Sequence, residues 1–253
     1  VLPRSPGPKP GDLAFCPARF HDHAMELDPA ALDIPSRYKL LIGCILPRPI
    51  ALVSTCASDG SLNLAPFSFF SGIGSNPMTL LFCPANNADG SEKDTLRNCK
   101  PVSEGGIGEF VVNVAPFSII KQVSAAAEPL PFRQSEFDLT GLTPCPSVAV
   151  TPPRVAESPI SFECRTLHVL RTNPGAPSGG NVVIGHVLRV HARDDVLNDR
   201  LHAGADALDL CGRMGGQTYC TTRERFDLPP GIDSLTRTIS PARSTPQPFR
   251  LDH

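Results

Sequence analysis

The sequence predicts a mainly β protein, built as a closed or nearly closed antiparallel barrel with a few added helices. Short apolar and β-branched segments recur at regular spacing, and the connections between them are short. Two longer segments, residues 159–172 and 181–195, alternate apolar and polar residues as strands with one buried face do. Few segments carry the apolar spacing of a helix, so an architecture dominated by strands is favoured.

A β-hairpin is expected near the start of this barrel. The segment IALVSTC at 50–56 is apolar and β-branched, which indicates a buried strand, and Asp59-Gly60 is a strong tight-turn signal. The segment SLNLAP at 61–66 alternates polar and apolar residues and returns as the second strand. Pro66 has no N–H to donate, so this strand must break or lie at a sheet edge there.

The next elements follow in chain order. The segment MTLLFCP at 78–84 is a third strand, a short helix covers residues 93–99, and EFVVNVA at 109–115 is a further strand. The segment FSIIKQVSAAAE at 117–128 is the best helix, because good helix formers place apolar residues at helical spacing and Pro129 stands just beyond its end.

Composition sets the two ends of the chain apart from its core. Residues 1–36 are rich in proline and predict an N-terminal arm, whereas residues 229–253 lose all periodicity and predict a C-terminal extension. The core domain is therefore expected over residues 37–228. With 253 residues, of which 41% are hydrophobic and 19% charged, the chain has enough apolar material for a packed core.

Charge and hydropathy argue against two classes of partner. The net charge is −2 and the basic residues are scattered, which gives no electrostatic case for nucleic-acid binding. No apolar stretch is long enough to cross a membrane, and the Pro-rich beginning lacks the apolar core of a signal peptide. We therefore expect a cytoplasmic protein that binds neither nucleic acid nor membrane.

The nine cysteines and seven histidines predict no metal site. The cysteine count is odd and no CxxC pair occurs, and Cys44, Cys83 and Cys164 lie in apolar runs where cysteine acts as a small hydrophobe. Free thiols indicate a reducing compartment. His186 and His191 lie on one predicted strand at an odd spacing, so regular alternation directs them to opposite faces of the sheet.

A candidate phosphate site surrounds the start of the predicted helix at 93–99. Lys93 supplies a cation, Thr95 supplies a hydroxyl, and the first turn of the helix supplies free backbone N–H groups. Ser54 and Thr55 can add hydroxyls from the end of the first strand. The plainer alternative is that Asp94 or Thr95 only caps the helix. Neither a GxxxxGK nor a GxGxxG sequence occurs, so a P-loop and a Rossmann site are unsupported.

The segment Ala65-Pro66-Phe67-Ser68-Phe69-Phe70 could hold a flat ring. Because Pro66 interrupts the strand, the N–H groups of Phe67 and Ser68 are free to point elsewhere. Such donors could stabilise negative charge on the N1/O2 edge of an isoalloxazine, with the phenylalanines as apolar walls. By spacing alone, these phenylalanines are better explained as core residues.

These segments together resemble one known family. RPIALVST at 48–55, DGSLNLAPFSFF at 59–70, KDTLRN at 93–98 and GEFVVN at 108–113, in this order and at these intervals, resemble the flavin reductase-like family with the FMN-binding split barrel. The resemblance spans about residues 38–228, and its later segments are GLTPCPS at 141–147, PPRVAESPISFEC at 152–164, IGHVLRVHARDD at 184–195 and GRMGGQTYC at 212–220. It implies a six-stranded antiparallel Greek-key barrel, a homodimer, and a flavin in a groove near the subunit interface.

The resemblance also implies roles for individual residues. The phosphate would be held by the segments around Thr55 and Lys93, and the ring would be cradled largely by backbone groups before Phe70. Arg48 and Asn98 would support the phosphate or its loop. The implied flavin-binding set is Arg48, Ser54, Thr55, Asn63, Ala65, Pro66, Phe67, Ser68, Phe69, Lys93, Asp94, Thr95 and Asn98.

Two segments bear on nicotinamide chemistry. The stretch containing Arg213 and Tyr219 resembles the one that approaches the flavin face where nicotinamide docks. In contrast, Gly179-Gly180-Asn181 stands where two-component reductases of the family carry Gly-Asp-His. The loop at 85–92 also lacks the arginines that family members often carry there.

Three functional hypotheses follow from the resemblance. The first is an FMN-binding oxidoreductase, with FAD as the alternative flavin, in which hydride passes from NAD(P)H to flavin N5 without a catalytic protein acid or base. Reduced flavin would then serve oxygen, a partner monooxygenase or a small organic substrate. The second hypothesis is a flavin-dependent oxidase or oxygenase that acts directly on a small organic molecule. The third is a flavin-binding module without turnover.

Overall fold

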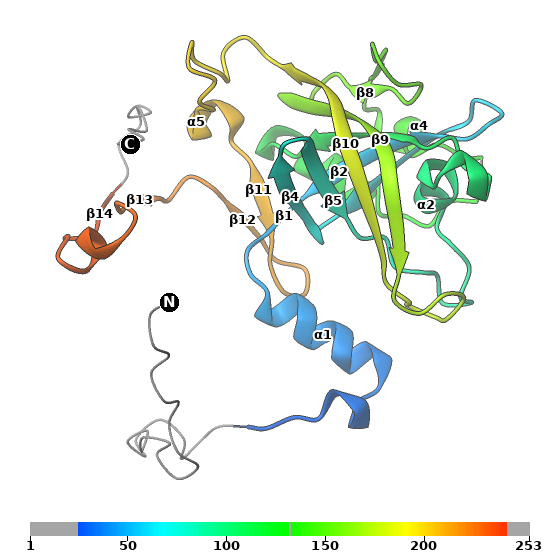
Figure 1. Cartoon of the computed structure of the whole chain (residues 1–253), viewed down its shortest axis with the longest axis horizontal. Coiled ribbons are helices and arrows are strands. Elements are labelled where there is room, and N and C mark those ends of the chain that lie inside the picture. The colour runs from blue at the N-terminus through cyan, green and yellow to red at the C-terminus, as the bar shows by residue number, and fades with distance from the viewer. Residues whose placement is uncertain (1–24, 132, 242–253) are drawn as a thin grey trace, which may run out of the picture. The chain divides into compact units, whose positions relative to one another are not determined.

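The computed structural model describes residues 25–131 and 133–241 (Figure 1). Most of the predicted arm and the end of the predicted extension therefore lie outside the described residues. Contacts divide the chain into two units, residues 1–38 and 39–253, and each is described by itself. In the first unit a short 3-10 helix, η1 (Pro29–Ala31), begins after Asp28, whose carboxylate accepts a hydrogen bond from the amide of Ala30 at 2.8 Å. The domain boundaries stay a prediction.

The second unit is built on a seven-stranded sheet in which all neighbouring strands run antiparallel. The mainly β, antiparallel prediction is confirmed, and each strand predicted from the sequence is present. The order of strands is β3-β2-β6-β9-β10-β5-β4. Their bounds are β2 (Ala51–Cys56), β3 (Leu62–Phe67), β4 (Phe70–Ser75), β5 (Met78–Phe82), β6 (Glu109–Val114), β9 (Ile160–Arg171) and β10 (Asn181–Ala192).

The sheet has one strand more than the six expected, because the run from 62 to 75 is interrupted. β3 and β4 are separated only by Ser68 and Phe69, yet they stand at opposite ends of the strand order. Pro66 lies in β3 on an edge strand, as its missing N–H predicts. The break itself comes after Phe67. β4 was not predicted, because FSGIGS has two glycines and little apolar alternation.

A buried carboxylate covers the exposed edge of β3. The amide of Leu64 donates to Oε2 of Glu136 at 2.8 Å, and Glu136 is only 7% exposed. Hydrogen-bonding directions alternate along an antiparallel strand, so position 66 faces the same way, and Pro66 has no N–H to satisfy. Glu136 begins helix α4 (Glu136–Thr140), whose N-cap is Ser135. The edge thus presents no unpaired donor at either position.

Smaller elements make up the rest of the described chain. A three-stranded sheet joins β1 (Arg48–Pro49), β11 (Cys211–Arg213) and β12 (Tyr219–Thr221), and two-stranded pairs join β7 (Pro144–Cys145) to β8 (Arg154–Val155) and β13 (Phe226–Asp227) to β14 (Ser240–Pro241). The remaining helices are α1 (Ile34–Cys44), α2 (Asp94–Cys99), η2 (Val102–Glu104), η3 (Phe117–Ile119), α3 (Ile120–Ala125), α5 (Ala205–Leu208) and η4 (Ile232–Leu235). The helix expected over 117–128 is present in part, because it begins with the 3-10 turn η3 and its α-helical portion ends at Ala125.

Two apolar clusters meet across β2, whose six residues are all buried. One cluster contains Ala51 and Val53 with Phe82 and Phe110, and α2 closes it with Leu96. The other contains Ile50, Leu52 and Leu64, packed against side chains of α3 and α4. Burial on both faces explains why residues 50–53 are apolar in succession instead of alternating, whereas the buried Ser54 and Thr55 that follow form hydrogen bonds. Each fully buried aliphatic side chain contributes about 1.5–3 kcal/mol.

A β-bulge in β10 overturns the expected orientation of the two histidines. The pairing with β9 shifts between Val187 and Arg189, so His186 lies opposite Arg165 and His191 lies opposite Ser161. Residues 161 and 165 share one face of β9, and both histidines therefore face the same side. The prediction of opposite faces is wrong because the bulge adds one residue to the strand.

Other expectations concern absences and apply to the described residues only. There, no group of three or more His, Cys, Asp or Glu side chains could hold a metal ion. No helix within 25–131 or 133–241 is both long and apolar enough to span a membrane. The eight described cysteines are unpaired; Cys164 is buried as expected, whereas Cys44 at the end of α1 is exposed.

Gly185→Ala should destabilise the protein by about 1–3 kcal/mol, as overpacking of a core does. A Cβ at this position in β10 would lie 2.3 Å from Cζ of the buried Phe110 and 3.2 Å from Cβ of Cys164. Gly72→Ala in β4 is the matched control, because a Cβ there meets nothing within 4 Å. Denaturant unfolding of both variants checks this, and equal stability of the two would contradict the packing described.

Glu136→Gln should stabilise the protein more at pH 7 than at pH 4. Burial, opposed by the hydrogen bond from Leu64 and reinforced by the charge of Asp94, raises the pKa of the Glu136 carboxyl. A raised folded-state pKa means that stability is lost as the pH rises from the unfolded value through the folded one. The glutamine keeps an acceptor for Leu64 without a buried charge. Thermal unfolding at both pH values tests this, and a pH-independent difference from wild type is the contrary result.

Candidate functional site

Arg48 is a buried guanidinium that ties three separate segments together. Its Nε donates to Oγ of Ser68 at 3.1 Å, and its Nη2 donates to the carbonyl of Met214 at 3.0 Å. Its Nη1 donates to the carbonyls of Ile42 and Ile45 at the end of α1. The side chain is only 3% exposed. Arg48 therefore positions the break between β3 and β4 against the turn that follows β11.

The break between β3 and β4 leaves backbone donors without partners. Phe67 is the last residue of β3 and pairs with Ala51. Within the described residues, the amides of Ser68 and Phe69 donate no hydrogen bond, although the carbonyl of Phe69 accepts one from Cys83 at 2.9 Å. Phe67 and Ser68 were the expected donors, whereas the structure leaves Ser68 and Phe69 available.

The aromatic side chains of this segment divide between core and surface. Phe67 is buried and packs on Phe82, with 5.1 Å between ring centres, as the core alternative predicts. Phe69 is half-buried, as are Ala65 and Pro66 beside it. Phe70 is half-buried as well but packs against the same cluster as Phe82, so Phe69 is the phenylalanine of this segment that is left to serve as an apolar wall.

Thr55, Thr95 and Asn98 of the expected phosphate site meet Asn63 of the expected ring site, but their polar atoms face one another. The amide of Asn63 donates to Oγ1 of Thr55 and to Oγ1 of Thr95, both at 3.0 Å, and the amide of Asn98 donates to Oγ1 of Thr55 at 3.1 Å. All four side chains are buried. Because they come from β2, β3 and α2, they fasten the helix to the hairpin.

The other phosphate-site residues lie apart from this group. Ser54 alternates to the opposite face of β2, where it donates to the carbonyl of Pro153 and accepts from the amide of Asn113 at 3.3 Å. Asp94 pairs with Arg97 at 3.2 Å. Lys93 is the N-cap residue of α2. The alternative prediction, that Asp94 or Thr95 caps this helix, is therefore wrong. Lys93 is exposed and forms no ion pair among the described residues.

The residues expected on the nicotinamide side stack on one another beside Arg48. Arg213 lies opposite Arg48 in β1 and opposite Tyr219 in β12. Its guanidinium carbon is 4.4 Å from the Tyr219 ring centre, and its Nη2 donates to the carbonyl of Gly216 at 2.7 Å. The aromatic ring and the backbone carbonyl together fix this arginine.

An apolar cavity of about 310 Å³ opens beside Tyr219. Phe117 and Ile120 line it from η3 and α3, and Cys211 and Cys220 line it from the hairpin. Burial, together with nearby negative groups, raises the pKa of the Cys211 thiol, so this thiol is not ionised at neutral pH. Sequence reasoning missed this cavity, because no local pattern shows that residues near 120 and 211–221 meet.

The two departures from the family pattern lie side by side. The buried amide of Asn181 donates to the carbonyl of Pro84 and to Oδ1 of Asn86, both at 2.9 Å, and the amide of Asn86 donates to the carbonyl of Ala176 at 3.0 Å. A Cβ on Gly90 would lie 2.2 Å from the carbonyl oxygen of Gly175. The loops at 85–92 and 172–180 are thus interlocked, which the sequence alone did not indicate.

Comparison with known proteins agrees with this fold. The model of the family "Flavin reductase like domain" matches residues 42–207. The crystal structure of nitrilotriacetate monooxygenase component B from Bacillus cereus is 31% identical, with a TM-score of 0.75, and the match covers 82% of this chain and 100% of that one. Pseudomonas fluorescens 2-nitrobenzoate 2-nitroreductase NbaA is 27% identical, with a TM-score of 0.71 and coverage of 81% and 95%.

A third structure bears on the fold alone. A split barrel domain protein from Shewanella frigidimarina is 20% identical, with a TM-score of 0.66 and coverage of 82% of this chain and 100% of that one. The expected split-barrel architecture is therefore confirmed, with the one additional strand described above. By the extent of its family match, this chain belongs to the flavin reductase like domain family.

Proposed function

We propose that this chain binds FMN and works as an NAD(P)H-dependent flavin reductase, acting as a homodimer. The observation that carries the proposal is the break between β3 and β4, where the amides of Ser68 and Phe69 have no partner among the described residues and Arg48 holds the turn. Unpaired backbone donors beside a half-buried aromatic side chain suit a flat ring with a polar edge. FAD stays the alternative flavin.

The protein's contribution is placement and electrostatics. The two free amides would donate to the N1/O2 edge of the ring, where negative charge develops on reduction. Lys93 would pair with the phosphate, since it is an exposed cation without an acidic partner among the described residues. The group of Thr55, Asn63, Thr95 and Asn98 would hold α2, and thereby Lys93, at a fixed distance from the hairpin.

When bound, the flavin supplies a hydride acceptor at N5. Arg213 and Tyr219 would border the face on which a nicotinamide docks, and no protein acid or base is needed for the transfer. Likeness to component B of nitrilotriacetate monooxygenase, at 31% identity, favours a partner monooxygenase as the destination of reduced flavin.

A second candidate is an enzyme that acts directly on a small organic molecule. Two observations favour it. One is the apolar cavity beside Tyr219. The other is that Asn181 binds Asn86 where two-component reductases of the family carry Gly-Asp-His. Likeness to 2-nitrobenzoate 2-nitroreductase, at 27% identity, agrees with such a reaction. A flavin-binding module without turnover is the third reading, and reduction by a nicotinamide separates it from the first.

Lys93→Ala should weaken FMN binding at least tenfold and leave the visible spectrum of bound flavin unchanged. The variant removes a charge-assisted contact to phosphate, of about 1.5–3 kcal/mol, and does not touch the ring. Lys39→Ala is the matched control, because Lys39 is also an exposed lysine, and it should bind FMN as wild type does. Fluorescence titration measures both, and equal curves for Lys93→Ala and wild type would remove Lys93 from the phosphate site.

Anaerobic addition of NADH or NADPH to the FMN-loaded protein should bleach the flavin absorbance. Bleaching within seconds supports the reductase. A flavin that binds but stays oxidised would move the function to the direct organic substrate or to the module without turnover. Failure to bind FMN at all would overturn the flavin site itself.

A further inference from the structure

A second, polar cavity of about 440 Å³ is lined by none of the residues assigned to the flavin. It is bounded by β8, by the connection from β8 to β9, and by the end of β10. Three basic side chains from different positions line it, namely Arg154, His191 and Arg193, against a single carboxylate, Glu157. Its volume is in the range of sites for small molecules.

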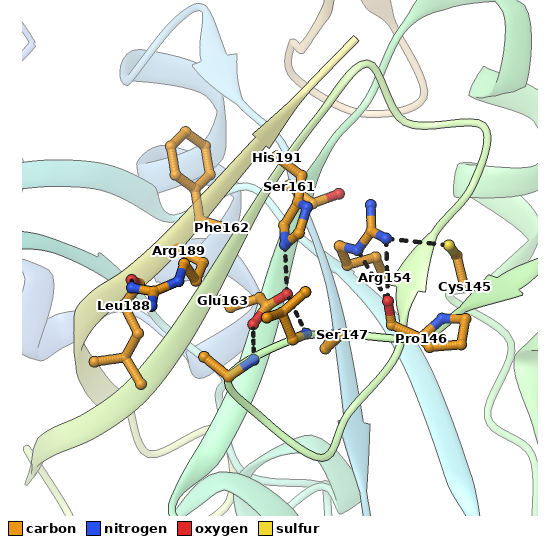
Figure 2. A network of polar contacts seen from close by, with 12 residues as sticks. Cys145, Pro146, Ser147, Arg154, Ser161, Phe162, Glu163, Leu188, Arg189 and His191 are labelled. Carbon is orange, nitrogen blue, oxygen red and sulfur yellow. Dashed lines mark hydrogen bonds and ion pairs between the residues drawn. The ribbon is translucent and has the colours of Figure 1, made fainter.

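Arg154 carries a charge that no acidic side chain neutralises among the described residues. Its Nε and Nη2 donate to the carbonyl of Pro146 at 3.3 and 3.0 Å, and Nη2 also contacts Sγ of Cys145 at 3.2 Å (Figure 2). These neutral partners orient the planar group and leave Nη1 without a hydrogen bond in the described part of the chain. A guanidinium held in this way has donors ready for an oxyanion.

His191 is fixed next to Arg154 by a buried carboxylate. Its Nε2 lies 2.5 Å from Oε1 of Glu163, which is fully buried and accepts the amides of Val148 and Ala149 at 2.9 and 2.6 Å (Figure 2). Burial opposes the ionisation of Glu163, but these two amides and the histidine outweigh it, so its pKa lies below the ordinary value. With Nε2 engaged, Nδ1 is the ring nitrogen left for a ligand.

The β10 bulge is what brings His191 to this place. The shift between Val187 and Arg189 sets His191 opposite Ser161, which also lines the cavity. Bulges commonly re-aim one side chain next to a site. An unshifted strand would have turned His191 to the other face, away from Glu163.

The other charged side chains at the cavity do not neutralise the charge of Arg154. Arg193 pairs with Asp195, at 2.5 Å from Nε, and donates to the carbonyl of Ala207 at 2.9 Å. Both oxygens of Glu157 lie 3.1 Å from the amide of Thr143. Neither carboxylate forms an ion pair with Arg154.

We propose that this cavity binds a small oxyanion, a carboxylate or phosphate group, held by Arg154 and His191 with Arg193 at its margin. The site is separate from the proposed flavin site and does not depend on the proposed function. Its ligand would accept planar, charge-assisted hydrogen bonds from the guanidinium and a second hydrogen bond from Nδ1–H of His191 in its imidazolium form, because Nε2–H is donated to Glu163.

Calorimetric titration with inorganic phosphate and with malonate, at constant ionic strength, tests this on the whole protein. One or both should bind wild type, and Arg154→Gln should weaken that binding at least tenfold. Arg165→Gln is the matched control, because Arg165 is exposed on β9, outside the cavity, and it should bind as wild type does. Preference for phosphate or malonate identifies which oxyanion class the site takes.

A second variant guards against misfolding, since Arg154 also tethers Pro146. His191→Gln should weaken anion binding three- to tenfold, and circular dichroism checks that both variants fold. Binding that is unaffected by both substitutions, or absent in wild type for both anions, overturns the proposal. Binding lost only in Lys93→Ala places the anion at the proposed flavin phosphate site and overturns it equally.

Discussion

The free edge of β3 is the constraint on which the rest of this structure depends. A strand at the end of a sheet exposes donors that invite further pairing. Here Glu136 takes the amide of Leu64, and Pro66 offers none. Because the edge is satisfied in this way, β3 needs no further strand beside it. The chain turns at Ser68 and Phe69, whose amides form no hydrogen bond among the described residues. The packing of α4 and the opening of the candidate site are thus two results of one arrangement.

Most polar side chains of the candidate flavin site hold the framework together, and few groups face a ligand. Thr55, Asn63, Thr95 and Asn98 satisfy one another and bind α2 to the hairpin, so a buried network replaces apolar packing at that junction. Arg48 does the same for the turn at Ser68. Among the described residues assigned to the ring and the phosphate, Lys93 and the backbone amides of Ser68 and Phe69 are left to face a ligand. Such a site draws its selectivity from fixed geometry more than from many side chains.

The local elements were predictable, whereas their long-range consequences were not. The strand at 50–56 and the helix at 93–99 follow from apolar runs and turn residues, which act over a few positions. The family motifs name Arg48 and Asn63 as flavin-site residues, but no local signal distinguishes a side chain that contacts a ligand from one that contacts a neighbour. The bulge before His191 was not predictable from the local sequence, because the pairing with β9 determines it. The contact of Asn86 with Asn181 likewise requires two distant loops to meet.

The interlocked loops at 85–92 and 172–180 make a mechanical link. Gly90 fits against Gly175 with no room for a side chain, and Arg171 pairs with Glu92, which also pairs with Lys100 just after α2. The tip of the β9–β10 hairpin is therefore tethered to the chain on both sides of α2. A displacement of Lys93 would be carried to that hairpin without passing through the core. Substitution in either loop is consequently constrained by the other, because a side chain at position 90 would require the backbone at Gly175 to move.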